Sequence, residues 1–589
     1  MLFSRHAAKV MAAGLFAALF AVPAQCQTVT ARAETAADPA ASALPVTDAQ
    51  GDDAAPRPES GAADPLTPAE TDKAAPLAPG APIDEPASTA ATTDPIVEAV
   101  RALLTTTPKP RRKDDADDLA AITAYYEAHR HAPIWTGGAG MTENAKRVLR
   151  EIAEAADWGL VPSDFELPAL PEQSPAVTKL AEAELALSVA VLKYARHARG
   201  GRLEPSAVSR KFDQKPVVFE PGSVLAAIAR AEAADAYLRS LHPKHPQFEL
   251  LRRALIAART AAAANGGKVP AGAVSARQIM ANLERWRWLP PELGRFHVWN
   301  SVPEQMTHVY LDGRSQFSER IVVGKTSSPT PVFSADMQFV IFHPSWGVPP
   351  GMKANELAPA LRNSGGGWFS SRPLASAVLR AHGLTAMRGG VPVNPDSVDW
   401  NNVDISSFHF TQPPGPTNVL GIVKFRFPNK HDVYMHDTQE RHLFGGKVRA
   451  FSHGCMRVQN PVRLAEVILA HDKGWSADEV KSQLRRGADV TLSTPVPVHT
   501  TYFTVRVEED GTVRSFADLY GLDARTASAI EGRSVTISPA AVAAAENGEQ
   551  VTPPPRQSRA SARRAERDAR RRAAQAPKPF NPFGSAYGQ

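Results

Sequence analysis

The chain has 589 residues, two cysteines and a formal net charge of +5. This length exceeds that of an ordinary single domain and allows a core that needs no disulfide bonds, which excludes a small disulfide-stapled scaffold. The charge is small for the size and uneven, because residues 33–95 are acidic and the C-terminal tail is basic.

The first 24 residues predict a secretory signal peptide. Arg5 and Lys9 form a positive n-region, residues 10–22 are almost wholly apolar, and small residues lead to an expected cleavage after Ala24. The apolar run is too short to span a membrane, and no later run of 18 apolar residues follows. We therefore expect a soluble protein exported to the periplasm. Cys26 lacks a good lipobox, which disfavours a lipoprotein.

The two ends of the chain have the composition of disordered segments. Residues 25–93 are rich in Ala, Pro, Asp, Thr and Ser, and they cannot bury enough apolar surface to offset the entropy of ordering. We expect a flexible tether there and a basic disordered tail over residues 526–589. An exported tail rarely meets nucleic acid, so its candidate partners are anionic cell-wall polymers or membrane headgroups. A solvated tail without a ligand is the alternative.

Residues 94–290 predict an α-helical domain. An apolar stripe on one helical face indicates a first helix near residues 94–104. Four further helices are expected over the ranges 142–159, 184–201, 245–267 and 275–290. The second of these five helices should begin at Thr142 as its N-cap and end at Gly159.

The helix that begins at Ser275 has the clearest boundaries. Ser275 and Gln278 have the spacing of a capping box, and Pro290-Pro291 end the helix. Its Arg-Trp-Arg-Trp run, residues 285–288, is interpreted as core packing in preference to a ligand-binding face.

Residues 291–525 predict a β-rich domain. Short apolar runs alternate with turn signals, and Asp312-Gly313 and Asp510-Gly511 each mark a hairpin. Strands are expected over the ranges 295–300, 307–324, 339–346, 419–427, 432–438 and 500–516. Residues 347–418 are rich in Gly, Pro and Asn, and we expect them to form a small folded insertion that acts as a lid or binding element.

The segment AFSHGCMRVQNP, residues 450–461, holds the one cysteine deep in the chain, Cys455. Alternation in DVYMHDT places Tyr434 and His436 on one strand face, with Val433 and Met435 on the other. Cys455 is expected in the turn between a strand and a helix that starts at Asn460. Cys455 lies five residues before this helix cap, which is too far for the helix dipole to activate the thiol. The thiol therefore needs a base.

An imidazole would supply that base. A thiol with a pKa of about 8.5 is only a few per cent thiolate at neutral pH, and a nearby histidine can take its proton and later return it to a leaving amine. Gly454 has no Cβ, and the amides of Gly454 and Cys455 could donate to a tetrahedral oxyanion. Arg457 could hold a substrate carboxylate or order the turn.

Two other roles for Cys455 stay open on chemistry alone. A lone cysteine is often an inert, buried core residue. Zinc is the second alternative, since several histidines lie nearby in sequence, but neither HExxH nor Cys-x-x-Cys is present. The candidate zinc ligands are His431, His436, His442, His453 and Cys455.

A longer pattern resembles a known family. His436, fifteen residues, and then Ser452-His453-Gly454-Cys455 followed by Met-Arg-Val resemble the signature of the L,D-transpeptidases with a YkuD-type catalytic domain. The segments ERWRWLP, IVVGK, FVIFHPSWGVPP, VLGIVKF, YMHDT and DLYGLD are similar to large periplasmic members, so the resemblance covers residues 115–525. It implies a multidomain α+β fold, with a β-rich mixed-sandwich catalytic domain preceded by an α-helical scaffold domain.

The resemblance also implies roles for individual residues. Cys455 would be the nucleophile and His436 the proton donor and acceptor, whereas proximity alone would favour His453 as the base. His453 becomes a supporting residue, and Gly454 contributes backbone to the oxyanion site. The positions expected to bind substrate are Tyr434, Trp346, Ser452 and Arg457.

The implied reaction is a peptidoglycan 3→3 cross-link. Cys455 would attack the diaminopimelate carbonyl of a donor tetrapeptide, release D-alanine and form a thioester, which the amine of an acceptor diaminopimelate then resolves. No metal or organic cofactor is implied, and carbapenems are expected to acylate the same thiol. The peptidoglycan-binding helical module of large relatives is not visible in this sequence.

Other functions are compatible with the sequence. The same fold could attach envelope proteins to peptidoglycan or exchange terminal D-amino acids. A non-catalytic wall-binding scaffold and a zinc hydrolase belong to different classes.

Overall fold

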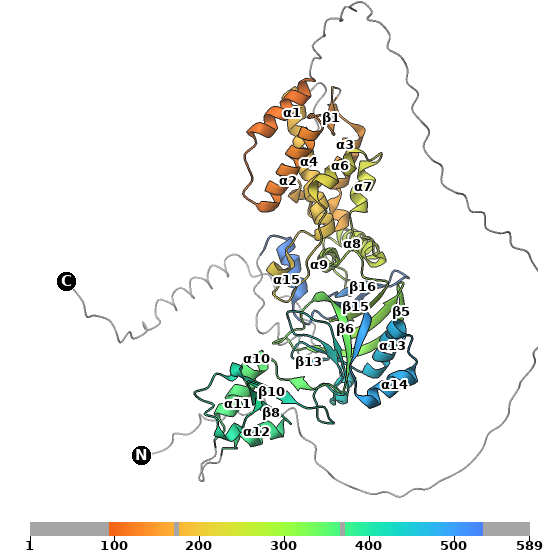
Figure 1. Ribbon diagram of the computed structural model, residues 1–589. Helices are drawn as coiled ribbons and strands as arrows, with labels where there is room; N and C mark the ends of the chain where they lie inside the picture. The colour runs from red at the N-terminus through yellow and green to blue at the C-terminus, as the bar shows by residue number, and fades with distance from the viewer. Residues whose placement is uncertain (1–93, 139, 170–175, 366–371, 534–589) are drawn as a thin grey trace, which may run out of the picture. The chain divides into compact units, whose positions relative to one another are not determined.

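The computed structural model describes residues 94–138, 140–169, 176–365 and 372–533 (Figure 1). The predicted signal peptide, the tether with Cys26 and all but the first residues of the predicted tail lie outside the described residues. In the part of the chain that is described, no helix combines the length and apolar character needed to cross a membrane.

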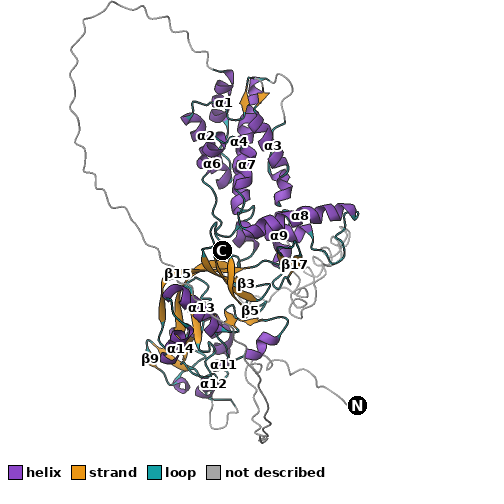
Figure 2. Ribbon diagram, turned by 90° about the vertical axis from the view of Figure 1, so that its right-hand side faces the viewer, coloured by secondary structure: helices purple, strands orange, loops and turns teal. Residues whose placement is uncertain are grey.

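Nine helices precede the β-rich region among the described residues (Figure 2). They are α1 (Pro95–Thr106), α2 (Lys113–Ala128), α3 (Glu143–Ala153), α4 (Val177–Gly200), α5 (Pro205–Val208), α6 (Pro221–Ala229), α7 (Ala234–Ser240), α8 (Pro246–Ala264) and α9 (Ala276–Arg287). Helix α4 is buried along most of its length and forms the centre of one hydrophobic core with α1–α3, α6 and α7. Strands β1 (Thr136–Gly137) and β2 (Gly140–Met141) form a small hairpin between α2 and α3.

The predicted helix boundaries are partly confirmed. Thr142 caps α3 through its side chain, and Ser275 caps α9 by accepting a hydrogen bond from the Gln278 N–H. Helix α3, however, does not reach Gly159. It ends at Ala153, and a tighter turn, η2 (Ala155–Trp158), follows before Gly159 closes it with a φ of 75°, a left-handed conformation that glycine adopts at little cost.

The Arg-Trp-Arg-Trp run is buried, which confirms its interpretation as core packing. Arg287 and Trp288 are both 0% exposed. Trp286 packs in a third core cluster with residues of α8 and of β16 (Val505–Val507), so this core joins the scaffold helices to the β-rich region.

The main sheet has nine strands in the order β13-β5-β14-β12-β11-β6-β15-β3-β4. The strands are β3 (Phe296–Ser301), β4 (Met306–Leu311), β5 (Arg314–Gly324), β6 (Phe333–Phe342), β11 (Val423–Arg426), β12 (Met435–His436), β13 (Ala450–Ser452), β14 (Met456–Val458) and β15 (Val490–Thr501). Because β4 also pairs with β5, the strands from β5 to β4 close into a ring. Helices α13 (Pro461–Lys473) and α14 (Ala477–Arg486) contribute Leu464, Ile468 and Val480 to the core of this domain (Figure 1).

Both predicted hairpins are present. Asp312 and Gly313 have φ angles of 48° and 76° between β4 and β5, the pair of left-handed residues that a type I′ turn requires. Gly511, with a φ of 84°, lies between β16 and β17 (Val513–Ser515).

The stretch between β6 and β11 folds around its own core, as expected for an insertion. Its elements are β7 (Trp346–Gly347), α10 (Pro350–Met352), the π-helical turn η4 (Lys353–Leu357), α11 (Ala358–Arg362), α12 (Ala375–Ala381), β8 (Thr385–Arg388), β9 (Val391–Pro392), the turns η5 (Pro395–Ser397) and η6 (Ile405–Ser407), and β10 (Phe408–Gln412). The strands form a separate sheet in the order β7-β10-β8-β9. Leu361, Leu379, Trp400 and Phe410 are among its buried core residues.

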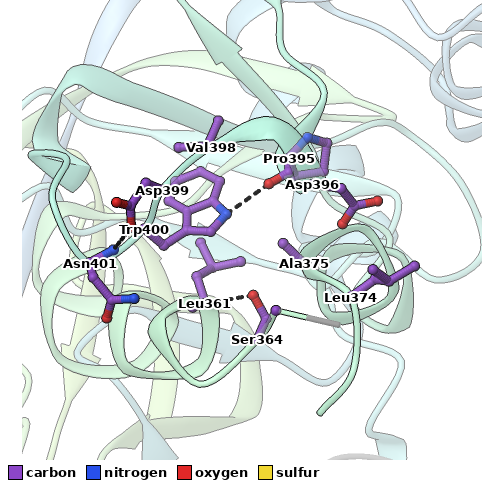
Figure 3. A pocket seen from close by; sticks show the side chains of 11 residues that line it. Leu361, Ser364, Leu374, Ala375, Pro395, Asp396, Val398, Asp399, Trp400 and Asn401 are labelled. Carbon is purple, nitrogen blue, oxygen red and sulfur yellow. Dashed lines mark hydrogen bonds between the residues drawn. The ribbon is translucent and has the colours of Figure 1, made fainter. Parts of the chain in front are cut away.

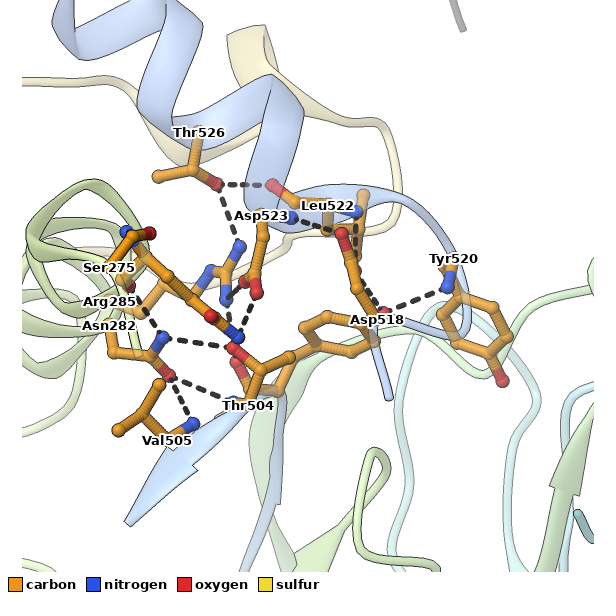
Figure 4. Close-up of polar contacts among 12 residues, drawn as sticks. Ser275, Asn282, Arg285, Thr504, Val505, Asp518, Tyr520, Leu522, Asp523 and Thr526 are labelled. Carbon is orange, nitrogen blue, oxygen red and sulfur yellow. Dashed lines mark hydrogen bonds and ion pairs between the residues drawn. The ribbon is translucent and has the colours of Figure 1, made fainter. Parts of the chain in front are cut away.

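The folded region extends past the predicted limit at residue 525. Helix α15 (Leu522–Ile530) buries Thr526, Ala527, Ser528 and Ile530, so the prediction that the tail starts at residue 526 is wrong. The helix is ordered by a buried polar cluster with α9, in which the Arg285 guanidinium bonds the Asp523 carboxylate at 2.6 Å and the Thr526 hydroxyl at 3.0 Å (Figure 4).

We expect Asp523→Ala to destabilise the protein by about 3–5 kcal/mol, because it leaves the Arg285 charge buried without a partner. Arg285 is 2% exposed, and Asp523 also accepts a hydrogen bond from Thr504. Thermal unfolding of the variant measures the loss. The matched control is Glu531→Gln, which breaks the more exposed Arg277–Glu531 pair between the same two helices and should cost less than about 1 kcal/mol. Equal effects of the two variants would contradict the prediction.

Candidate active site

Cys455 lies in a short bend between two strands. Strand β13 ends at Ser452, and β14 begins at Met456. The prediction that Cys455 lies in a turn between a strand and a helix is therefore wrong, because strand β14 intervenes before α13. The strand anchors the cysteine more firmly than a loop would, since it pairs with a neighbour on each side.

Strands β12 and β14 are parallel neighbours, with Met435 opposite Met456 and His436 opposite Arg457. Both methionines are fully buried in the core. Side chains alternate along a strand, so His436 and Arg457 lie on the opposite face. The Met456 N–H donates to the Tyr434 carbonyl at 3.1 Å, which places the residues before each strand side by side as well. The alternation predicted for DVYMHDT is thereby confirmed.

His436 has a defined tautomer. Its Nδ1 lies 2.6 Å from the Asp437 carbonyl oxygen, which can only accept, so Nδ1 carries the proton and Nε2 keeps a lone pair. The Asp437 side chain accepts hydrogen bonds from the Ile422 and Thr438 amides and pairs with Arg441, which fixes the residue that orients the ring. Burial and, to a smaller extent, the Arg457 charge lower the pKa of His436 to about 3. The imidazole is therefore neutral at pH 7.

The Cys455 thiol is also neutral at pH 7. Burial raises its pKa to about 11, against the opposing effects of hydrogen bonds from Tyr434 and the charge of Lys424. Its Sγ lies 3.9 Å from the Asp432 carbonyl oxygen, a weak acceptor for the S–H proton. The resting site thus holds a thiol and an imidazole, both uncharged.

We expect the alkylation of Cys455 by iodoacetamide to accelerate about tenfold per pH unit from pH 7 to 10, because only the thiolate reacts and its fraction rises until the pKa near 11. The measurement uses a Cys26→Ser background, so that one thiol is followed. The urea-unfolded protein, with a pKa of about 8.5, should instead reach its plateau above about pH 9. A plateau of the folded protein near neutral pH would show a thiolate–imidazolium pair and contradict this prediction.

The Ser452 side chain stabilises the bend through two hydrogen bonds. Its hydroxyl donates to the Cys455 carbonyl oxygen at 2.5 Å and accepts from the Gly454 N–H at 3.2 Å. The Gly454 amide, expected to serve an oxyanion, is thus already bonded, and Ser452, expected to bind substrate, is 2% exposed. The Cys455 N–H has no hydrogen-bond partner among the described residues.

The other side of this bend is anchored by Thr330. Its hydroxyl donates to the Gly454 carbonyl oxygen at 2.9 Å and accepts from the Gly324 amide at 2.8 Å. Tyr520 accepts from the Thr330 amide and donates to the Gly324 carbonyl, so the DLYGLD segment supports the bend. The carbonyl and the N–H of one trans peptide point in opposite directions. Thr330 therefore directs the Cys455 N–H away from the buried interior.

His453 contacts the insertion. Its Nε2 lies 2.9 Å from a carboxylate oxygen of Glu356, in η4, and 3.1 Å from the Lys325 Nζ. One nitrogen cannot donate to a carboxylate and accept from an ammonium at once, so these two contacts exclude each other. His453 thus lies between Lys325, the residue after β5, and Glu356 of the insertion, and not against the thiol.

The remaining predicted residues separate into two groups. Arg457 pairs with the Glu440 carboxylate, which leaves it ordered and charge-compensated. Tyr434 is 8% exposed; it hydrogen-bonds Cys455 and Trp346, and its ring lies under the Lys424 ammonium. The structure therefore groups Tyr434 and Trp346 with Cys455, and assigns Arg457 a partner within the protein.

Sequence reasoning did not single out Lys424, Thr330 or Glu356. Lys424 had a local signal, since it is a charged residue within the apolar strand segment VLGIVKF. Thr330 and Glu356 had none, because their contacts with the bend are 124 and 97 residues away in sequence.

A cavity of about 350 Å³ lies within the insertion, lined by residues of α11, α12 and the segment after η5 (Figure 3). Trp400 donates its indole N–H to the Pro395 carbonyl, and the Asp396 and Asp399 carboxylates accept backbone amides. These groups are satisfied within the insertion, and no residue of β12 or β14 lines the cavity.

The candidate metal ligands do not converge. In the described ranges, no three His, Cys, Asp or Glu side chains are grouped as a metal site. His431 bonds Asp213 through Nε2 at 2.8 Å, and His453 contacts Glu356.

Two family models match the chain. Residues 120–255 match a scaffold domain, and residues 295–498 match an L,D-transpeptidase catalytic domain. A curated protein of Haemophilus influenzae with the name "Putative L,D-transpeptidase" is 25% identical over 418 residues, which cover 68% of this chain and 78% of that protein.

Solved structures show a weaker likeness. L,D-transpeptidase LdtMt1 in complex with imipenem is 13% identical with a TM-score of 0.17, and L,D-transpeptidase 3 from Mycobacterium tuberculosis is 12% identical with a TM-score of 0.17. Each match covers 35% of this chain, and 59% and 61% of those chains, less than two thirds of either.

Proposed function

Because the chain carries a YkuD-type L,D-transpeptidase catalytic domain behind a scaffold domain, we propose that it forms 3→3 cross-links in peptidoglycan through a Cys455 thioester. The observation that carries the proposal is the pairing of β12 with β14. Support comes from His436, whose Nε2 keeps a lone pair, because it lies on the strand next to β14, which begins directly after Cys455.

The first half-reaction starts from the neutral pair. As the Cys455 sulfur attacks the carbonyl carbon of the donor's third residue, its proton passes to His436 Nε2. The carbonyl oxygen becomes an oxyanion, and the Cys455 N–H is the donor aimed at it. The C–N bond then breaks, His436 returns the proton to the departing amine, and D-alanine leaves.

The second half-reaction reverses these roles. The side-chain amine of an acceptor diaminopimelate attacks the thioester carbonyl and gives a proton to His436. The C–S bond breaks, the sulfur recovers that proton, and a new amide joins the two stem peptides. The Asp437 carbonyl, 2.6 Å from Nδ1, keeps the ring in the orientation that both steps need.

The proposed place of action is the periplasm. Support comes from the signal peptide predicted for residues 1–24. Tethering through residues 25–93 and contact of the basic tail with anionic envelope polymers belong to the same proposal.

The function is tested with purified protein and a disaccharide-tetrapeptide. Mass spectrometry should find dimers joined between the two diaminopimelate residues, with release of one D-alanine per dimer, and a carbapenem should add its intact mass once, at Cys455. Turnover that survives chelation is expected, since no step above uses a metal. Absence of both the dimer and the carbapenem adduct would overturn the proposal.

Thr330→Val should slow carbapenem acylation about tenfold or more, because the Cys455 N–H loses its fixed direction, whereas deletion of a whole oxyanion donor costs about 10²–10³-fold. Alkylation of Cys455 by iodoacetamide forms no oxyanion and should keep its rate. Thr330→Ser keeps the hydroxyl and should stay close to wild type. If alkylation and acylation slow by the same factor, Thr330 supports the fold of the bend and not the oxyanion.

A further inference from the structure

Lys424 occupies an unusual position for a charged residue. It lies on β11 directly opposite His436 of β12, and directly opposite residues of an antiparallel pair share one face of the sheet. That face also carries Tyr434, whose ring centroid is 3.9 Å from the Lys424 Nζ. The ammonium is therefore held beside the thiol and the imidazole.

This ammonium has no anionic partner in the part of the chain that the structure describes. No carboxylate lies within ion-pair distance of Lys424, and no acceptor lies within hydrogen-bond distance. The titratable groups that face it from further away are Asp432, Asp489, Arg426 and the Cys455 thiol. Its side chain is half-buried, and burial lowers its pKa.

Neighbouring cations differ in this respect. Arg457 is paired with Glu440, and Lys325 lies against His453, whose ring also contacts Glu356. A half-buried cation without a counter-ion is costly unless a ligand supplies the charge, and a desolvated ammonium gains most from a carboxylate. Arg457 was the residue expected to hold a substrate carboxylate, but its charge is already compensated.

We propose that Lys424 binds a carboxylate of the acyl donor and thereby selects donors that carry a free acid beside the bond to be broken. This inference rests on the proposed function, which supplies two such carboxylates: the second carboxylate of diaminopimelate and the terminal carboxylate of the departing D-alanine. Tyr434 holds the ammonium by a cation–π contact, which orients it without neutralising it.

The test measures binding and turnover with three donors: the free tetrapeptide, the form amidated on diaminopimelate, and the form ending in D-alaninamide. In wild type, one of the two amides should lower kcat/KM about 10- to 100-fold, the range of a charge-assisted hydrogen bond, and so identify the carboxylate. Lys424→Met should process that amide and the free acid equally well. Lys424→Arg should restore part of the preference.

The control is Arg426→Gln, two residues along the same strand, which should keep the wild-type preference. Lys424→Gln serves as a second, polar replacement if the methionine variant does not fold. If Lys424→Met slows the reaction of all three donors by the same factor and shifts the pH profile of Cys455 alkylation, Lys424 activates the thiol. That result would overturn the inference.

Dissociation constants in a Cys455→Ala background separate this inference from the proposed function. If wild type turns over no donor but the Cys455→Ala protein still prefers the free acid through Lys424, the proposed reaction fails and the carboxylate site stands. If wild type forms 3→3 dimers from acid and both amides alike, the reaction stands and the carboxylate site fails. No binding of any donor to the Cys455→Ala protein also overturns the site.

Discussion

We expect Cys455→Ala to eliminate the proposed 3→3 dimer formation and carbapenem acylation while leaving the fold intact. No other described side chain offers a thiol, since Cys455 is the one free cysteine in the described part of the chain. In other enzymes, removal of a nucleophile costs about 10⁶-fold in kcat. The bend is held through the Cys455 carbonyl, which accepts from the Ser452 hydroxyl, and through the pairing of β14, so alanine keeps these hydrogen bonds.

The measurement counts dimers and adducts by mass spectrometry, with Tm as the check on folding. Cys455→Ser is the informative companion, since its hydroxyl has the shape of the thiol but is a far weaker acid, and it should be as inactive as alanine. Dimers at wild-type levels from Cys455→Ala would mean that the sulfur forms no covalent intermediate.

His436→Gln should reduce both acylation and transfer by about 10³-fold or more, because a neutral thiol with a pKa near 11 holds only about one part in 10⁴ as thiolate at pH 7. Without a proton acceptor, reaction depends on that small fraction. The rate of the variant should therefore rise with pH up to about 11. The wild-type rate should not follow the thiolate fraction, because His436 accepts the thiol proton.

Two further variants test whether His436 is the base. His453→Gln should lose far less activity, since the His453 ring contacts Glu356 and Lys325 and not the sulfur. The double variant Cys455→Ala/His436→Gln should be no worse than Cys455→Ala alone, because the two groups act as a unit. Equal losses for His436→Gln and His453→Gln would contradict the assignment of the base.

Local pattern was sufficient for much of the fold. Caps at Thr142 and Ser275, the Asp312-Gly313 turn and the alternation of DVYMHDT are each decided by residues within a few positions, and each is confirmed. Burial of Met435 and Met456 then decides which face of β12 and of β14 points to the core.

Other features depended on groups distant in sequence. The sequence could show that Gly454 lacks a Cβ, but not that its amide would be taken by Ser452 and its carbonyl by Thr330. The partner of His453 depends on how the insertion folds its π-helical turn, and no local pattern reports that. The pKa values of the pair could not be predicted either, because burial dominates both of them.

The closed ring of strands has a consequence for biosynthesis. Strand β15 is its last member in sequence, yet it pairs with β6 on one side and β3 on the other. A chain made from its amino end therefore keeps both of those edges unsatisfied until residues 490–501 emerge, and open edges invite pairing between nascent copies. Tyr520, which supports Thr330 beneath the thiol, is made later still. Nearly the entire folded region must thus be made before the cysteine acquires its support, so truncated products will expose open strand edges and be aggregation-prone.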